Sequence, residues 1–590
     1  MKKVLLLIFA SLLAVASQAQ RFDWVNFTPS VSGYNSSGGE AICKDGNGNL
    51  YTAATFDGRI VAGSDTINVF YFGSGDIYLT KWSPEGQVIW VKVMGGTWYD
   101  FAYELKYDQQ NNQIKFSCVV QGDSTKMSDT TYHNVTSNQI VTFDTDGNFI
   151  SVLFYNGSNA GEMNIDHNHL YYLDGWTTID KADMDGNVLW SKTATGGLFM
   201  NYLTNDGNGN VLVSGIFFGS FIIGNDTVTE LYSGPGSGTF LIKLDSSGNV
   251  LWGKFIGNLT HTYYQPIPVA TDNANNIYVG DEYALSGQSY GTDTLTNYGN
   301  NSGCVLKFDS NGNALGAITW GATQGAYLNQ VKISGNDVFA AGSYQGSVTV
   351  GTQAVNVPTN ELGYLIKFDE EGNLQFMAPC GTTNGYSNVA DFVWENGDQY
   401  FLSGTSNGNN NGIFGCYTTS YYTQFLTKVT DTVFTAPTVQ LSWDGVTLST
   451  QYTGTNDSFS WLLNGNAING ATGSTYIPTV NGTYVVNAES YGCTATDTLD
   501  ITNVGVSEVS EGVISVYPNP AQNRILVSVP ATFHADVLAV TDMNGTEMFS
   551  MPAEDKNEFS LSVADMPSGF YLLKLKARSK IMYCPFVVSR

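Results

Sequence analysis

The sequence predicts an all-β protein made of several domains, and three observations support this prediction. The chain has 590 residues, which is more than a single hydrophobic core organises. It holds 64 glycines, 34 tyrosines and 32 phenylalanines, a composition typical of short aromatic strands joined by many turns. An Asp-x-x-Gly-Asn pattern also recurs between residues 144 and 373, which indicates a repeated unit.

Residues 1–19 have the pattern of a secretory signal peptide. Two lysines at the start are followed by an apolar run from Val4 to Val15, as in exported proteins. Small residues just downstream predict cleavage between Ala19 and Gln20. Later stretches fall short of the roughly 18 apolar residues that a membrane span needs. We therefore expect a mature chain without a transmembrane segment.

The repeated unit contains a strand that ends in lysine, then a tight turn, then a strand that often carries tryptophan. Gly and Asn accept the positive φ of hairpin turns, and Asp bonds to the backbone two residues on. Most units are about 60 residues long, enough for a four-stranded propeller blade with one long loop. The turn glycines are residues 86, 147, 186, 248, 312 and 372, and Trp90, Trp190, Trp252 and Trp320 follow four of them.

Six complete turns are present, yet the pattern predicts seven blades. A further unit begins near Asn396 and continues to Lys428, and then lacks its turn and final strand. The segment around Trp24 resembles the missing strand. We expect this N-terminal strand to close a seven-bladed β-propeller spanning residues 20–433, because an open ring would leave two unpaired sheet edges.

These units resemble the bacterial β-propeller repeat family over about 400 residues. Propellers of this kind are usually interaction scaffolds, so the resemblance implies no single activity.

Residues 434–502 change pattern and predict a small β-sandwich. The segments 458–464 and 482–487 alternate between apolar and polar residues, and Trp461 is expected to fill the centre between two sheets. The module resembles the immunoglobulin-like or PKD-like spacers of exported bacterial proteins. Cys493 is its only cysteine, so the inter-sheet disulfide of antibody domains is not expected here.

An acidic linker, residues 503–513, leads to the most specific pattern in the chain, in residues 514–590. Its motif residues are Tyr517, Pro518, Asn519, Pro520, Asp542, Gly545, Gly569, Tyr571 and Lys574. This segment resembles the type A C-terminal sorting domain of the type IX secretion system and predicts a second small β-sandwich. The resemblance implies transport across the outer membrane, removal of the domain by a sortase near the linker, and attachment to lipopolysaccharide.

The charge balance excludes several partners and substrates. A net charge of −27 disfavours nucleic acid, whose phosphates an acidic surface repels. The turn from Asp245 to Trp252 is close to the Asp-box of sialidases. That activity needs several arginines for the substrate carboxylate, and residues 22–430 hold only Arg59.

No residue is assigned a catalytic, cofactor-binding or metal-binding role. Asp166, His167 and His169 could bind a metal, but they align with a turn of the other units. The Asp45-x-Asn47-x-Asn49 start of a calcium loop lacks the glycine and glutamate of that loop. Ser289 lies in a Gly-x-Ser-x-Gly string without the strand and helix of a nucleophile elbow. Seven cysteines leave two possibilities open, a Cys380–Cys416 bridge or isolated thiols.

The favoured function is that of a binding or adhesion protein, secreted or displayed on the outer-membrane surface, that uses the propeller to hold a glycan or a protein. Its expected partners are the secretion machinery and the sortase, and no cofactor is expected. Two alternatives stay open. One is a polysaccharide-degrading enzyme whose acids converge on the propeller channel from different blades, and the other is a structural component of a surface layer.

Overall fold

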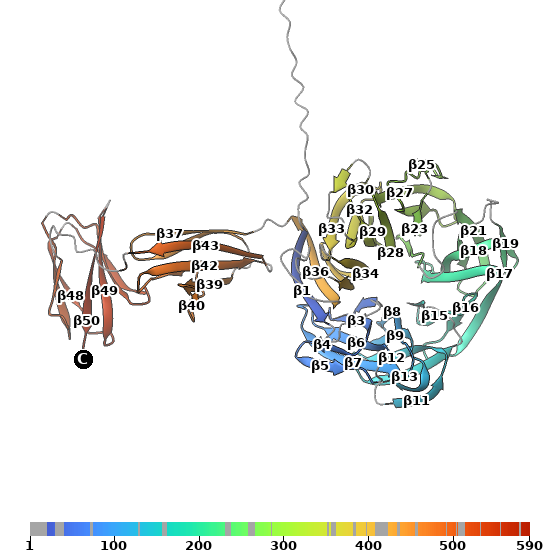
Figure 1. The fold of residues 1–590 in the computed structure, drawn as a ribbon, viewed down its shortest axis with the longest axis horizontal. Helices are drawn as coiled ribbons and strands as arrows, with labels where there is room; N and C mark the ends of the chain where they lie inside the picture. The colour runs from blue at the N-terminus through green and yellow to red at the C-terminus, as the bar shows by residue number, and fades with distance from the viewer. Residues whose placement is uncertain are drawn as a thin grey trace, which may run out of the picture. The chain divides into compact units, whose positions relative to one another are not determined.

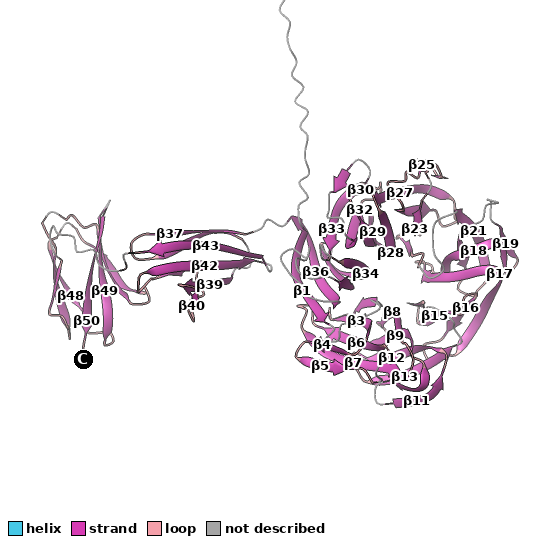
Figure 2. Cartoon of the chain, in the orientation of Figure 1, coloured by secondary structure: helices cyan, strands magenta, loops and turns pink. Residues whose placement is uncertain are grey.

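The computed structural model describes most of the chain, and in the described residues every regular element is a strand (Figure 2). Two compact units are present, residues 1–435 and 436–590, and each is treated by itself. The signal peptide with Ala19, nearly all of the 503–513 linker and Cys416 lie outside the described residues. The described ranges are 20–29, 41–70, 75–127, 130–155, 162–229, 238–257, 266–284, 286–350, 353–355, 361–381, 385–396, 398–407, 423–433, 437–454, 458–490, 493–502, 504, 514–531, 533–554, 556–577 and 580–590.

The first unit is a series of antiparallel four-stranded meanders, which confirms the all-β prediction. Figure 1 shows them arranged around a common centre in a propeller-like region, with β8, β28 and β34 on the inner side. The first two meanders are β2 (Ala41–Lys44), β3 (Leu50–Phe56), β6 (Asp76–Trp82) and β7 (Val88–Gly96), then β8 (Phe101–Asp108), β9 (Gln113–Val119), β12 (Asn138–Asp144) and β13 (Phe149–Tyr155). The next two meanders share the long strand β17 (Val188–Asn205). One consists of β14 (Met163–Asp166), β15 (His169–Asp174), β16 (Thr178–Ala182) and β17. The other consists of β17, β18 (Val211–Ile223), β20 (Gly238–Leu244) and β21 (Val250–Gly257).

Three more meanders complete the series. They are β22 (Val269–Thr271), β23 (Ile277–Tyr283), β26 (Ser302–Phe308) and β27 (Ala314–Ala322), then β28 (Gly325–Ser334), β29 (Asp337–Gln345), β32 (Glu361–Phe368) and β33 (Leu374–Cys380), then β34 (Tyr386–Asn396), β35 (Gln399–Asn407), β36 (Thr423–Val433) and β1 (Gln20–Pro29). Short additional strands lie in the connections: β4 (Arg59–Ala62), β5 (Asp65–Asn68), β10 (Gly122–Met127), β11 (Thr130–Val135), β19 (Asp226–Thr229), β24 (Ser289–Tyr290), β25 (Asp293–Thr294), β30 (Val348–Val350) and β31 (Gln353–Val355).

The N-terminal strand is the outer strand of the last meander. β1 pairs antiparallel with β36, and Trp24 lies opposite Lys428, the pairing that the sequence predicts for these segments. Phe22 and Val25 of β1 are buried in a core shared with the last two meanders. The two ends of the first unit therefore belong to one sheet, which removes the edge that β36 would otherwise expose.

A repeated contact joins successive meanders and explains three of the four repeat tryptophans. In each case a lysine of the third strand lies opposite a tryptophan of the fourth, and both donate to one turn carbonyl of a following meander. Lys81 and Trp90 donate to the carbonyl oxygen of Thr145 at 2.7 and 3.3 Å. Lys181 and Trp190 donate to that of Ser246 at 3.0 and 3.1 Å. Lys243 and Trp252 donate to that of Ser310 at 3.1 and 3.3 Å. We call each set a turn latch. These three tryptophans therefore connect neighbouring meanders.

Trp320 does not belong to this set, although it also follows a turn. It lies opposite Gly303 rather than a lysine, is fully buried, and its indole N–H donates to Tyr364 at 3.3 Å. Trp24 instead occupies the latch position, since it lies opposite Lys428 and packs against Gly86. The difference arises because Trp90, Trp190 and Trp252 each lie four residues after their turn glycine, whereas Trp320 lies eight residues after Gly312. Gly316 stands at the fourth position instead and lies opposite Lys307.

Replacement of Gly248 by alanine tests the latch directly. Gly248 has φ +82°, and a Cβ there would lie 2.9 Å from the Trp190 ring. Gly335 has φ +60° and nothing within 4 Å of such a Cβ, so Gly335→Ala is a matched control for backbone strain alone. We expect Gly248→Ala to lose about 1–3 kcal/mol more than the control, because only Gly248→Ala overpacks a contact. Urea unfolding followed by tryptophan fluorescence measures the difference, and equal losses would contradict the latch.

The second unit holds two modules, each made of two small sheets over a shared core. In residues 437–502 the sheets are β37 (Thr438–Trp443), β38 (Leu448–Thr453) and β41 (Thr475–Tyr476), and β40 (Asn466–Ala467), β39 (Ser458–Leu463), β42 (Gly482–Ser490) and β43 (Cys493–Ile501). Trp461 is buried at the centre of their core and donates to Gly473 O at 2.9 Å, which confirms the prediction for this residue.

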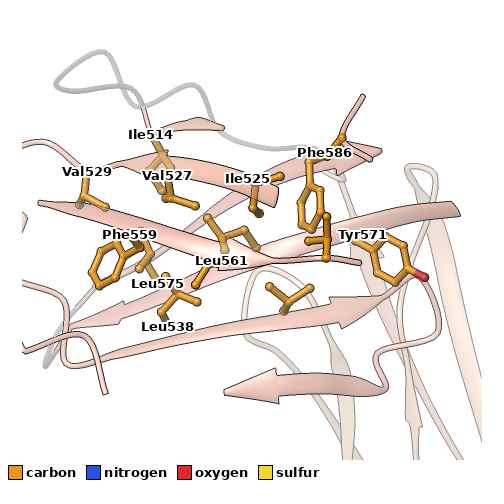
Figure 3. Packing of buried hydrophobic residues seen from close by; sticks show 14 of the residues in the cluster. Ile514, Ile525, Val527, Val529, Leu538, Phe559, Leu561, Tyr571, Leu575 and Phe586 are labelled. Carbon is orange, nitrogen blue, oxygen red and sulfur yellow. The ribbon is translucent and has the colours of Figure 1, made fainter. Parts of the chain in front are cut away.

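The last module, residues 514–590, has the same two-sheet plan. Its sheets are β44 (Ser515–Tyr517), β45 (Arg524–Ser528) and β48 (Glu558–Ser562), and β47 (Glu547–Pro552), β46 (Val537–Asp542), β49 (Gly569–Ala577) and β50 (Lys580–Val588). Figure 3 shows apolar side chains from both sheets, among them Ile525, Leu561 and Phe586, gathered between the strands. The alternation of buried and exposed residues along β45 is what a two-sided strand with one core face requires.

Candidate functional site

The aspartates that open the repeated turns stabilise those turns by accepting hydrogen bonds within them. The Asp183 carboxylate accepts the backbone N–H of Asp185 at 3.0 Å and of Asn187 at 2.8 Å, and the Asn187 side-chain amide at 2.8 Å. These hydrogen bonds, led by that of the Asn187 side chain, lower the pKa of Asp183. The same pattern occurs at Asp144, Asp245, Asp309 and Asp369 and, in the inner turns, at Asp45, Asp206 and Asp272. The Asp-box and calcium-loop interpretations are therefore not needed for Asp245 or Asp45.

The histidine pair also lies in a turn. His167 and Asn168 both have positive φ, at 47° and 62°, in the hairpin between β14 and β15. His167 Nδ1 lies 2.7 Å from Asp166 Oδ1, and this hydrogen bond raises the pKa of the exposed imidazole. No group of three or more metal-ligating side chains is found in the described part of the chain.

Neither Ser289 nor Cys380 has the surroundings of a catalytic or disulfide-forming residue. Ser289 lies in the short β24–β25 hairpin, where its hydroxyl is 3.3 Å from that of Thr294, and no helix follows it. Cys380 is a free, buried thiol, so the Cys380–Cys416 bridge is wrong. Cys493 is disulfide-bonded. Burial raises the pKa of the Cys380 thiol, which makes it inert at neutral pH.

A ring of polar residues lines the centre of the propeller-like region, and sequence reasoning missed it. The inner strands carry a shift of register at the same place, and the residues there are Glu104, Tyr202, Gln330 and Asp391. A bulge adds a residue to one strand and re-aims its side chain. Glu162 is the equivalent residue before β14, since Glu104, Glu162 and Tyr202 each lie four positions before the Asp that opens the next turn. Alignment of the units on that Asp indicates these three positions but not Gln330 or Asp391, since Ser334 and Glu395 stand where the Asp would be.

The axial ring contains two ion pairs and a third buried acid. Lys106 pairs with Glu104, and Lys332 pairs with Asp391 at 2.5 Å. Burial raises the pKa of Glu162 well above its usual value; the Glu104 and Asp391 carboxylates raise it further, and Lys106 opposes them. Acids from three meanders thus converge on the axis, and lysines neutralise two of them.

A second polar site is a pocket of about 230 Å³ near the starts of β28 and β34. It is lined by Tyr327, Asn329, Ser343, Glu361, Tyr386 and Asn388. The Ser343 hydroxyl donates to Glu361 Oε1 at 2.6 Å, and the Asn329 amide donates to Asn388 Oδ1 at 2.6 Å and to Val389 O at 2.9 Å. Burial raises the pKa of Glu361, and the Ser343 hydrogen bond opposes that shift. The pocket combines tyrosine rings with carboxylate and amide groups.

Exposed aromatic side chains occur in the connection between β7 and β8. Trp98 and Tyr99 keep 50% and 57% of their surface accessible, and Phe101 keeps 38%. Asp100 anchors this segment, because its carboxylate accepts the N–H groups of Gly96 at 2.7 Å and Gln121 at 3.0 Å. Burial raises the pKa of Asp100 to about 8, against the effect of these hydrogen bonds. Asp100 thus anchors a segment that exposes two large aromatic side chains, Trp98 and Tyr99.

In the last module, the Tyr-Pro-Asn-Pro motif is exposed but fixed to the final strand. Asn519 Oδ1 accepts Val587 N–H at 2.8 Å, and Ala521 exchanges backbone hydrogen bonds with Val587 and Ser589 at 2.7 and 2.8 Å. Tyr517 keeps 73% of its surface accessible, and it lines a shallow groove of about 500 Å³ together with Pro518, Pro520, Gln522, Asn523, Arg524 and Leu526. The motif therefore presents a surface rather than a core.

Residues 515–589 match the family described as the secretion system C-terminal sorting domain. This segment is a type IX sorting domain. The protein is accordingly secreted or displayed on the cell surface. No match was found among curated proteins.

Other motif residues of the sorting domain support its fold. The Asp542 carboxylate accepts the N–H groups of Asn544 and Thr546 at 2.9 and 2.8 Å, and Gly545 has φ +83°. Tyr571 is buried, and its hydroxyl donates to Pro567 O at 2.9 Å. Gly569 begins β49, and the Lys574 ammonium lies 5.6 Å from the centre of the Tyr583 ring.

Three solved structures are similar to parts of the chain. A protein of unknown function from Bacteroides caccae has 13% sequence identity and a TM-score of 0.24, and the match covers 41% of this chain and 89% of that chain. BamB from Moraxella catarrhalis has 11% identity and a TM-score of 0.32, and the match covers 68% of this chain and 99% of that chain. A protein of unknown function from Dyadobacter fermentans has 10% identity and a TM-score of 0.33, and the match covers 70% of this chain and 98% of that chain. At these TM-scores the similarities carry no functional conclusion. In the described part of the chain, no helical segment meets the length and hydrophobicity that a membrane span requires.

Proposed function

We propose that this protein is a surface-displayed binding protein, delivered by type IX secretion, that holds a glycan or a surface protein on one end of a closed seven-bladed propeller. In this proposal each four-stranded meander is a blade, residues 434–502 are an immunoglobulin-like or PKD-like spacer, and the sorting domain is removed by a sortase on attachment to lipopolysaccharide. The observation that carries the binding function is the segregation of roles between the two ends of the meanders.

The two ends differ because antiparallel meanders send their connections alternately to opposite ends. Connections from first to second strands and from third to fourth strands hold the Asp turns and the turn latches. The other connections hold the long inserts, the exposed Trp98 and Tyr99, and the mouth of the Tyr327–Tyr386 pocket. Loops on a rigid scaffold are where binding residues concentrate. One end therefore supports the scaffold, and the other is available for a ligand.

A binding screen with the mature protein tests this function. The purified chain from residue 20 is presented to immobilised glycans and to outer-surface proteins of the same cell type. We expect saturable binding that the double variant Trp98→Ala/Tyr99→Ala or pocket substitutions weaken. Absence of binding to both classes of ligand would contradict the proposal.

Removal of residues 514–590 is expected to leave the protein in the periplasm, because it can no longer cross the outer membrane. The physical reason is that the exposed Tyr-Pro-Asn-Pro surface, held by Asn519 on β50, is then missing. Cell fractionation and immunoblotting measure the distribution. The Asn519→Ala variant should accumulate in part in the periplasm instead of reaching the surface. Asn557→Ala, in the exposed turn before β48, is the matched control and should reach the surface normally. Normal surface display of the truncated chain would contradict this role.

A second candidate function is hydrolysis of a polysaccharide in the propeller channel. The observation that favours it is the convergence of Glu104, Glu162 and Asp391 on the axis, with a raised pKa for Glu162 as a general acid would require. The lysine partners of Glu104 and Asp391 favour instead an ion-pair network that fills the centre. Release of reducing ends from surface polysaccharides, lost in Glu162→Gln, would establish the enzyme.

A further inference from the structure

We propose that the pocket lined by Tyr327, Asn329, Ser343, Glu361, Tyr386 and Asn388 binds a single uncharged sugar ring of a glycan chain. This inference rests on the proposed binding function and names its site and ligand class. The pocket is built before a ligand arrives, its polar groups suit hydroxyls, its walls suit an apolar ring face, and its charge excludes anions.

The pocket is preformed because two meanders approach closely there. Glu361 of β32 and Tyr386 of β34 form the parallel bridge that links these two meanders. Gly363 makes this approach possible, since a Cβ at that position would lie 2.9 Å from the backbone nitrogen of Val389. Glu282 holds the neighbouring strand by accepting Leu328 N–H at 3.0 Å. A ligand therefore meets side chains that are already in place.

The polar groups of the pocket offer acceptors and a donor next to one another. Hydrogen bonds to Ser343 and between the two asparagines use Glu361 Oε1, Asn329 Nδ2 and Asn388 Oδ1. Among the described residues, Glu361 Oε2, Asn329 Oδ1 and Asn388 Nδ2 have no such protein partner. A carboxylate or carbonyl oxygen accepts a hydroxyl proton, and an amide N–H donates to a hydroxyl oxygen. Adjacent hydroxyls of a sugar ring need this combination.

Two tyrosines supply the walls. Tyr386 keeps 40% of its surface accessible, so a ligand can reach its ring. Tyr327 is half-buried; burial raises the pKa of its phenol, and the charge of Glu361 raises it further. The rigid ring faces accommodate the C–H faces of a pyranose, while the phenol groups add polar contacts.

The charge of the site selects against anionic ligands. None of the six lining residues is a lysine or arginine, and Glu361 is an acid. The chain as a whole carries a net charge of −27. A carboxylate or phosphate group would be repelled without a cationic partner. At about 230 Å³ the pocket is also smaller than typical drug-sized sites, which suits one sugar unit.

The test uses the full mature chain from residue 20 on an array of neutral oligosaccharides of glucose, galactose, mannose and N-acetylglucosamine, with sialylated, uronic-acid and sulfated glycans beside them. Titration calorimetry then measures Kd for the neutral glycan with the strongest signal. We expect Glu361→Gln and Asn388→Ala to weaken binding about 10-fold or more, because each loses a hydrogen bond to the ligand. Glu371→Gln, the same change in an exposed turn, is the control and should bind as the unmodified protein does.

The outcomes separate the pocket from the broader function. Preference for the acidic glycans, or no neutral glycan bound, would overturn the ligand class, while binding to a surface protein would still support the proposed function. If Glu361→Gln and Asn388→Ala bind a neutral glycan as tightly as the Glu371→Gln control does, the glycan site lies elsewhere. Tyr386→Ala, at an exposed position, repeats the test if Glu361→Gln fails to fold, and it too should weaken binding.

Discussion

A mature chain that lacks residues 20–29 is expected to lose the folded propeller region. The β1 strand made by these residues pairs with β36 along its length, from Gln20–Val433 to Pro29–Thr423. Phe22 and Val25 are buried in the core of the last two meanders, and burial of two such side chains contributes about 3–6 kcal/mol. The lost ladder hydrogen bonds add to this, and a typical domain is stable by only about 5–15 kcal/mol.

Circular dichroism and limited proteolysis of the truncated chain measure this loss. A synthetic peptide of residues 20–29 is the control, because strand addition to an exposed edge should restore the missing sheet. Rescue by this peptide, and none by a scrambled peptide of the same composition, would show that the sheet position matters. An unchanged melting temperature in the truncated chain would contradict the role of β1.

Asp206→Asn is expected to destabilise the first unit by about 3–5 kcal/mol, because it leaves Lys243 charged and buried without its partner. Lys243 Nζ lies 2.9 Å from Asp206 Oδ2, and both side chains are almost inaccessible. The same carboxylate accepts the N–H groups of Asn208 and Asn210, both at 2.9 Å. This residue therefore fixes a turn and neutralises a lysine of a turn latch at once.

A double-mutant cycle separates these contributions. Lys243→Met removes the charge and leaves the turn hydrogen bonds of Asp206, so it should cost less than Asp206→Asn. Asp206→Asn/Lys243→Met should recover part of the loss, since no unpaired charge stays buried. Urea unfolding gives the three values, and a loss below about 1 kcal/mol for Asp206→Asn would contradict the assignment.

The pH dependence of stability has a definite sign at Asp206. Burial alone would raise its pKa, but the hydrogen bonds of Asn210 and the Lys243 ammonium outweigh this and lower the pKa. A lowered folded-state pKa means that the stabilisation is complete above the unfolded value of about 3.9 and is lost as the pH falls through the folded value. Asp206→Asn should therefore flatten the fall of stability in acid.

Features that depend on local chemistry were predictable from the sequence. The Asp turns follow from Asp, Gly and Asn at fixed offsets, and the structure shows their hydrogen bonds at each position. The pairing of Trp24 with Lys428 of β36 was predictable because one repeat unit is divided between the two ends of the first unit. Trp461 and the sorting-domain motif were equally readable, since alternation and residue order are local properties.

Features that depend on contacts between distant strands were not predictable in the same way. The residues of the Tyr327–Tyr386 pocket come from four strands and share no spacing. The axial ring depends on bulges, which appear only when two strands are paired. In each case tertiary packing, not propensity, decides where the side chain lies.

Amide hydrogen exchange of the intact mature protein measures whether the N-terminal strand β1 is part of the last sheet of the first unit. We expect peptides covering residues 22–28 to be protected as strongly as those covering 424–430, because the two segments pair along their length. Rapid exchange of residues 22–28 while 424–430 stay protected would show that the strand is not part of the sheet, and would contradict the closed propeller.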